Sequence, residues 1–264
     1  MKKLFYLMVV IAVLGLIVSG CSIPLKSVVP TSEKGDPKPE LGAPTLEKIT
    51  FIHYAKPNDR SKPEWDETVD MYKLLSGGLK WPATMQYEVN TKGSAGMGGD
   101  LDHNDVMDAL SASLETWDEE FPFNLFNDEL GTTEKGFVSG EESIDGKLVR
   151  INRVTWDDLT EIYGANVIAV YSMWYYPATK EIIESDVRFN TFYKWSVDVE
   201  EKCPEDEMDL QSIATHEFGH NGLNDLYSPP STALTMYGYG DFGEIHARSL
   251  GTGDISGIQK LYGE

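Results

Sequence analysis

The sequence predicts an α+β domain in which a twisted mixed β-sheet is combined with a long helix, a helix carrying two histidines, and a C-terminal helix. Three observations support this class. Residues 85–90 alternate as a strand should, residues 106–117 have helical periodicity, and the last quarter of the chain holds two further helical patterns. No internal repeat is present. The chain is therefore expected to fold as one domain that follows a distinct N-terminal segment.

The elements of the first half follow from local patterns. A glycine-rich loop precedes the long helix, and its apolar stripe is Val106, Ala109, Leu110, Ser113, Leu114 and Trp117. Asp145-Gly146 predicts a turn that leads into a strand at 147–151. Residues 167–176 form a long run rich in β-branched and aromatic side chains, which indicates another strand.

The helix with two histidines belongs to the stretch from Thr215 to Tyr227. His216 and His220 are four residues apart, so their imidazoles project from one face of a helix toward the same point. Glu217 stands beside the first histidine, where its carboxylate can reach a water on a bound metal. This arrangement predicts a zinc site with Glu217 as the general base of a peptidase. The competing interpretation is a solvated helix with two satisfied histidines.

The flanking residues favour a real helix at this point. One side is apolar at helical spacing, and the stretch Pro204–Glu207 places a proline and three acids where the first turn is expected. Gly222 is predicted to end the helix with a positive φ. The apolar positions are Leu210, Ile213, Ala214 and Phe218.

A catalytic zinc needs a third protein ligand and one open position. Asp225, five residues beyond His220, is the first candidate. A water, or an acid farther along such as Asp241 or Glu244, is the alternative.

These residues resemble the matrixin branch of the metzincin metallopeptidases. His-Glu-Phe-Gly-His at 216–220 matches the family motif, and Gly-Leu-Asn-Asp-Leu-Tyr at 222–227 is similar to its turn and third ligand, in the variant that uses Asp. One departure is that a single residue, Asn221, separates His220 from Gly222, where the family has two. The resemblance therefore implies Asp225 as third ligand through the surrounding turn pattern, and it implies a metzincin-like catalytic domain.

Other segments extend the resemblance to about residues 80–264. Residues 233–239 resemble the methionine turn beneath the zinc, with Met236 as its apolar floor, although an ordinary core methionine would look the same. Residues 254–263 resemble the closing helix. By the same resemblance, 167–176 is the edge strand along which an extended peptide lies antiparallel. Tyr237 and Tyr239 are candidates to assist the oxyanion of the reaction.

The N-terminus predicts export. Residues 1–20 begin Met-Lys-Lys, continue with an apolar run to Val18, and end in small residues before Cys21, which resembles a lipoprotein signal with Cys21 as the lipidated residue. An ordinary signal peptide or a short membrane anchor is the alternative. Residues 21–45 are rich in proline and predict an extended, lipid-anchored linker, leaving 46–264 as the catalytic domain. We expect a protein held outside the cytoplasm at a cell surface or membrane, or else secreted.

The net charge and the cysteine count exclude some classes of binding partner and an internal disulfide. The formal net charge is −21, from 22 basic and 43 acidic residues, which argues against binding to nucleic acid or anionic lipid. If Cys21 carries lipid, Cys203 is a lone thiol that cannot form an internal disulfide. We expect a monomer that contacts a membrane only through its N-terminal lipid or signal.

One zinc is predicted. His53, His103 and His246 are isolated in the sequence and are interpreted as ordinary histidines. Asp100, Asp102 and Asn104 alternate like the start of a calcium loop, but residue 105 is not glycine and residue 111 is not glutamate. Helix capping by Asp102 explains the pattern better, with Ca²⁺ as the alternative.

The sequence as a whole predicts a zinc-dependent endopeptidase that acts on extended peptides or proteins outside the cytoplasm. The alternative is a catalytically inactive surface lipoprotein that keeps zinc for a structural or ligand-binding role.

Overall fold

The computed structural model describes residues 45–56, 66, 68–75, 77–92, 101–198 and 202–263. The predicted signal peptide, Cys21 and nearly all of the predicted linker lie outside these residues, as does Asp100, so the domain boundaries at 20 and 45 stay predictions. Within the described part of the chain, no helix combines the length and hydrophobicity that crossing a bilayer requires.

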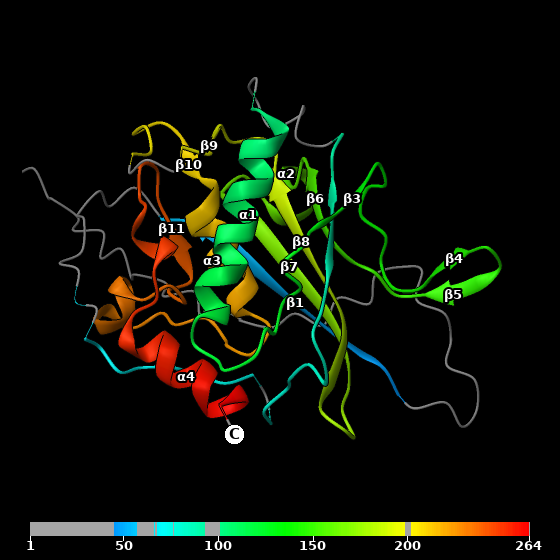
Figure 1. Cartoon of the computed structure of the whole chain (residues 1–264). Helices are drawn as coiled ribbons and strands as arrows, with labels where there is room; N and C mark the ends of the chain where they lie inside the picture. The colour runs from blue at the N-terminus through cyan, green and yellow to red at the C-terminus, as the bar shows by residue number, and fades with distance from the viewer. Residues whose placement is uncertain are drawn as a thin grey trace, which may run out of the picture.

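A mixed β-sheet forms the main layer of the described chain (Figure 1). Its seven strands follow the order β11-β1-β7-β8-β6-β2-β3. The half from β8 to β3 is parallel, whereas β7 is antiparallel to both β8 and β1. The strands are β1 (Glu47–Ala55), β2 (Tyr87–Asn90), β3 (Gly131–Thr133), β6 (Asn152–Asp157), β7 (Val167–Tyr176), β8 (Glu181–Asn190) and β11 (Tyr239–Gly240).

The helices α1 and α3 lie together on one face of this sheet, and α4 lies near the end of α3 (Figure 1). Trp117 of α1 joins the two helices, because its Nε1 donates to the carbonyl oxygen of Thr215 at 2.8 Å. This arrangement confirms the predicted α+β class. The helices are α1 (His103–Asp118), α2 (Thr160–Tyr163), α3 (Leu210–Gly219) and α4 (Thr252–Tyr262), with the 3₁₀ turns η2 (Pro229–Ala233) and η3 (His246–Arg248).

Two small strand pairs complete the described fold. The hairpin of β4 (Glu142–Ile144) and β5 (Lys147–Val149) projects away from the sheet (Figure 1). Its turn is the predicted Asp145-Gly146, where both residues have positive φ, at 50° and 76°. The pair β9 (Trp195–Ser196) and β10 (Met208–Asp209) leads directly into α3.

The long helix forms as its apolar stripe predicts. Val106, Leu110 and Leu114 are buried with Trp117 against the core. Asp102 caps the helix, since its side chain accepts from the backbone N–H of Asn104 at 2.7 Å. The capping interpretation of Asp102 is thus confirmed.

The predicted start of the histidine helix was wrong. The helix α3 begins at Leu210, and its first turn contains no acid. Asp209 is the cap, accepting from the backbone N–H of Ser212 at 2.7 Å, while Pro204–Glu207 lie before β10. The proline and acids therefore do not mark the start of the helix, because the short strand β10 lies between them and Leu210.

The prediction that Gly222 has a positive φ was also wrong. Gly222 is instead required by close approach: a Cβ at this position would lie 2.8 Å from Leu261 Cδ2 and 2.9 Å from Ile258 Cδ1, both on α4. Its missing side chain lets the segment after α3 lie directly against α4.

The strand at 167–176 is not the edge of the sheet. β7 pairs with β8 on one side and along nearly its whole length with β1 on the other, from Glu47 opposite Tyr175 to Tyr54 opposite Val167. No strand was predicted before residue 80, although residues 49–54 are all β-branched or aromatic apart from His53.

The steric role of Gly222 can be tested by a mutant cycle. Gly222→Ala should lower the free energy of unfolding by about 1–3 kcal/mol through overpacking against α4. In a Leu261→Ala background the cost should shrink, because the closer of the two clashing methyl groups is gone while Ile258 Cδ1 remains. Urea unfolding followed by tryptophan fluorescence measures both.

Gly136→Ala is the matched control, since a Cβ there meets nothing within 4 Å and its cost should stay within about 0.5 kcal/mol. An unchanged cost of Gly222→Ala when both Leu261→Ala and Ile258→Ala are present would show a backbone requirement instead.

Candidate metal centre and active site

The helix α3 presents both histidines of the motif on one buried face. The exposed fractions of His216 and His220 are 1% each. The Nδ1 atom of His216 lies 2.7 Å from the carbonyl oxygen of Thr235, and that of His220 lies 3.0 Å from the carbonyl oxygen of Leu223. With Nδ1–H donating to a carbonyl in each case, the Nε2 atoms are left as acceptors for a metal.

Asp225 meets these two nitrogens. Its Oδ1 lies 3.3 Å from His216 Nε2 and 3.5 Å from His220 Nε2. The three residues form a buried group, which we call the metal group, and their candidate ligand atoms lie within 4.8 Å of one another. The structure therefore brings together the three residues that the sequence nominated as zinc ligands.

The chemistry of this group fits zinc. His216 Nε2 and Asp225 Oδ1 are buried without a hydrogen-bonding partner among the described residues. Buried polar atoms are nearly always satisfied, so two orphaned acceptors facing one another point to a cation. Two imidazole nitrogens and one carboxylate are a donor set that catalytic zinc accepts, with a position left open.

The shortened linker after α3 still delivers Asp225. The chain turns at once, with the N–H groups of Gly222 and Leu223 both donating to the carbonyl of Gly219. Asn224 then donates to the carbonyl oxygen of Lys73 at 2.7 Å, which fixes the returning segment. A tight turn therefore replaces the residue that the family motif has and this chain lacks.

Asn221, the single residue in that linker, is a buried hydrogen-bonding centre. Its Oδ1 accepts from Trp81 Nε1 at 2.7 Å and Tyr171 OH at 2.6 Å. Its backbone carbonyl accepts from Tyr262 OH at 2.7 Å. Asn221 thus ties the end of α3 to β7 and to α4, a role that the sequence did not reveal.

Asp241 and Glu244 do not join the metal group. The two groups of potential ligands found in the described residues are His216–His220–Asp225 and His53–His216–Glu217. Glu244 instead pairs with Lys56, at 2.7 Å between Oε1 and Nζ. Both acids line the adjoining pocket, so the geometry favours Asp225 over either as the third ligand.

Glu217 lies next to the metal group and is fully buried. Its Oε2 has no hydrogen-bonding partner in the described chain, and its Oε1 lies 3.1 Å from His53 Nδ1. Burial raises the pKa of the Glu217 carboxyl to about 8, and the nearby His216 opposes that rise. A buried carboxyl with a raised pKa beside a metal site is a candidate proton carrier.

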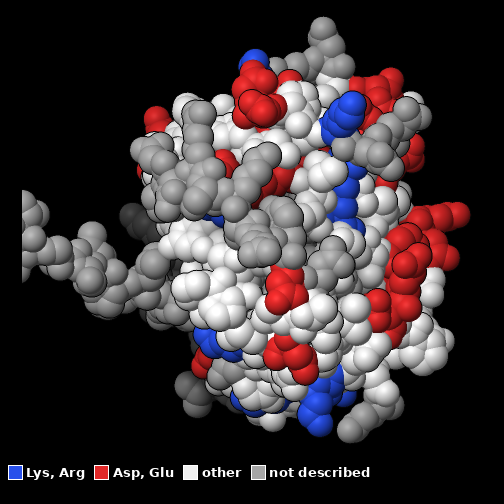
Figure 2. Space-filling view, turned by 90° about the vertical axis from the view of Figure 1, so that its left-hand side faces the viewer, with Lys and Arg blue, Asp and Glu red and all other residues white. Residues whose placement is uncertain are grey.

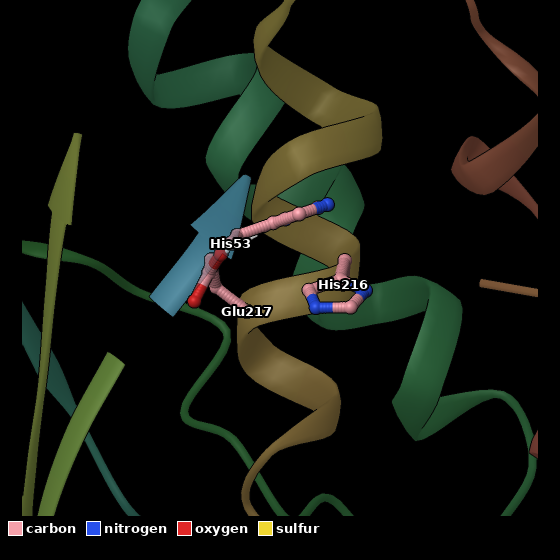
Figure 3. A group of neighbouring side chains, drawn as sticks. All are labelled: His53, His216 and Glu217. Atoms are coloured by element: carbon pink, nitrogen blue, oxygen red, sulfur yellow. Dashed lines mark hydrogen bonds and ion pairs between the residues drawn. The ribbon is translucent and has the colours of Figure 1, made fainter. Parts of the chain in front are cut away.

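The interpretation of His53 as an isolated histidine was wrong. His53 reaches from β1 to α3 and faces Glu217 (Figure 3). Its ring also packs on the ring of His216, with centroids 3.9 Å apart. Burial lowers the pKa of His53 well below its usual range, so the neutral ring can donate from Nδ1 to the Glu217 carboxylate. The two residues are 164 positions apart in the sequence, and the packing of β1 against α3 brings them together.

The methionine turn lies beneath the histidines and is held from the closing helix. Met236 is buried, with an exposed fraction of 1%. Asp254 of α4 accepts from the backbone N–H groups of Thr235 and Met236, at 2.8 and 3.1 Å. Because the carbonyl of Thr235 also accepts from His216, Asp254 positions the metal group from below. The only sequence feature that points to this role of Asp254 is its place as an acid in the first turn of the last helix.

The tyrosines after the turn border the site. Tyr237 and Tyr239 line a pocket next to His216, and their ring centroids are 5.7 Å apart. Tyr227 acts differently, because its OH donates to Asp225 Oδ2 at 3.0 Å and so orients that carboxylate. His246 also lines the pocket, whereas Cys203 is in neither group of potential metal ligands.

The fold and the site together define a candidate zinc hydrolase: a mixed sheet backs a helix whose two histidines meet a carboxylate beside a buried glutamate. The family model for matrixins matches residues 80–263. This match covers more than half of the chain, and the chain therefore belongs to the matrixin family, which implies a zinc metallopeptidase. No curated protein shows a significant match to the chain.

Zinc affinity can show whether Asp225, rather than Asp241 or Glu244, is the third zinc ligand. Asp225→Ala should weaken zinc binding by about 100-fold or more, since it removes a ligand rather than a residue that only supports one. Asp241→Ala and Glu244→Ala, the matched controls, should leave the affinity unchanged. Competition with a chromophoric chelator measures all three, and an equal loss in Glu244→Ala would move the third ligand to that residue.

Proposed function

We propose that this matrixin is a zinc-dependent endopeptidase that cleaves extended peptides or proteins outside the cytoplasm. The observation that carries the proposal is the convergence of His216, His220 and Asp225 beside the buried carboxyl of Glu217. Two neutral imidazoles and one carboxylate would leave a bound Zn²⁺ with net positive charge. Zinc there would polarise a substrate carbonyl and lower the pKa of a water.

Glu217 carries the proton in the proposed reaction. Its unpartnered Oε2 takes a proton from the attacking water as the peptide carbon becomes tetrahedral. The same carboxyl then donates that proton to the departing amine, which completes hydrolysis of the peptide bond. Tyr237 and Tyr239 border the pocket, and in this proposal they assist the developing oxyanion.

The location and partners are part of the proposal. Lipidation at Cys21 would attach the domain to a membrane through the linker of residues 21–45, and the domain would act as a monomer on peptide substrates. Acidic side chains gather along the right-hand side of the face shown in Figure 2. With a net charge of −21, such a surface disfavours nucleic acid as a partner. One catalytic zinc is proposed, and nothing supports a calcium site beyond the sequence alternation around Asp102.

One observation favours the alternative of a zinc-binding lipoprotein without turnover. β1 lies along β7 and places His53 on Glu217, where a reacting water would need to stand. A permanently filled site would bind zinc and cleave nothing. The test of function must therefore include a variant in which this contact is removed.

Peptide cleavage that depends on Glu217 distinguishes the peptidase from the inactive zinc-binding lipoprotein. The zinc-loaded chain, its His53→Ala variant and its Glu217→Gln variant are compared on a broad library of quenched fluorescent peptides, with metal content measured for each. Glu217→Gln should keep zinc and lose about 10²–10⁴-fold in kcat/KM.

Glu115→Gln, an exposed change on α1, is the matched control and should retain full activity. If neither the wild type nor His53→Ala shows cleavage that Glu217→Gln abolishes, the peptidase function is wrong and the zinc-binding alternative stands.

A further inference from the structure

The groove beside the candidate active site is filled by the chain's own strand β1. On one side β1 pairs antiparallel with β7 over eight residue pairs, from Glu47 to Tyr54. On the other side its end pairs in parallel with β11, with Tyr54 opposite Tyr239 and Ala55 opposite Gly240. The next N–H, that of Lys56, donates to the carbonyl of Gly240 at 2.9 Å. β1 thus bridges the sheet and the segment that follows the methionine turn.

Alternate side chains of β1 enter the site. Phe51 stacks on His220, with ring centroids 4.0 Å apart and an interplanar angle of 13°. His53, two residues on and therefore on the same side of the strand, covers His216 and contacts Glu217 (Figure 3). The strand thus covers both proposed metal-binding histidines and the proposed general base.

Lys56 extends the contact beyond the metal group. Its Nζ lies 2.7 Å from Glu244 Oε1, and both side chains are largely buried, with 12% and 7% exposed. Glu244 belongs to the pocket that also holds His53 and Tyr239. The acidic side of the pocket is therefore already paired with the basic residue that directly follows β1.

This position is the one an extended peptide would need. Added strands are held mainly by backbone hydrogen bonds to a sheet edge, with alternate side chains entering pockets, and β1 is held in this way. The side of β7 that pairs with β1, and the Oε1 of Glu217, cannot serve β1 and a substrate together.

We propose that β1 is an intramolecular pseudosubstrate, so that the folded chain is latent and accepts a peptide only when residues 47–56 leave the groove. The proposal rests on the peptidase function proposed above. It also defines a substrate class: an extended peptide running antiparallel to β7, with a basic residue three positions after the one that takes the place of His53, where it would meet Glu244.

A reversible disulfide tests whether β1 must move. Thr50 and Ser172 face each other across β1 and β7, with their side-chain oxygens 3.2 Å apart, so a cystine can bridge these positions. They alternate with Phe51 along the strand and so point to the opposite face of the sheet from the metal group. Thr50→Cys with Ser172→Cys, in a Cys21→Ser, Cys203→Ser background, gives a strand that oxidation locks and a phosphine reductant releases.

Two measurements are made on the zinc-loaded chain in each redox state: cleavage of the peptide library, and binding of a peptide hydroxamate that ends in a zinc-chelating group. The locked form should show at least about tenfold less of both than the released form. Lys56→Ala, which removes the contact with Glu244, should raise both by about tenfold. The single variant Thr50→Cys in the same background controls for the redox treatment and should not respond to it.

The outcomes separate this inference from the proposed function. Measurable and equal cleavage by the locked and released forms overturns the pseudosubstrate and leaves the peptidase intact. Hydroxamate binding to the released form alone, with no cleavage by any form, supports the pseudosubstrate and contradicts the proposed peptidase function. Equal binding, or none, in both redox states overturns the pseudosubstrate.

Discussion

The convergence of His216, His220 and Asp225 is the constraint on which the arrangement of this domain depends. Three polar side chains are buried within 4.8 Å of one another, and such a group is costly unless each member is held and a cation is shared. α3 supplies two members from a single face, and the tight turn through Asn221 and Gly222 returns the third. The packing of α4 against that turn, where only a glycine fits, follows from the same requirement.

Support for the metal group comes from elements far apart in the sequence. Asp254 holds the backbone of Thr235 and Met236, and the carbonyl of Thr235 fixes the ring of His216. Asn221 ties the end of α3 to β7, and Tyr227 orients Asp225. Each contact satisfies a buried polar group while it sets the position of a candidate ligand, so stability and site geometry are coupled.

β1 gives the protein a second level of organisation. It completes the sheet and contributes Phe51 to the core, yet it does so in the groove where the family's activity would require a peptide. A strand held by backbone pairing and a few side-chain contacts is a part of the fold that can exchange with a similar strand. With β1 as the proposed pseudosubstrate, stability of the folded chain and access to Glu217 are opposed, and the contacts of His53 and Lys56 set the balance between them.

Local patterns in the sequence were sufficient for the histidine helix, the long helix capped by Asp102, the Asp145-Gly146 turn and the α+β class, because these depend on spacing and backbone preference over a few residues. The nomination of Asp225 came from a motif, and the returning turn after α3 explains why it works despite the missing residue. The start of α3, the reason for Gly222, and the roles of Asp254 and Asn221 required the packed structure, since each depends on a partner distant in sequence. His53 is the clearest case. Nothing near it in the sequence suggests a function, and only the packing of β1 against α3 brings it to Glu217, 164 residues away in the sequence.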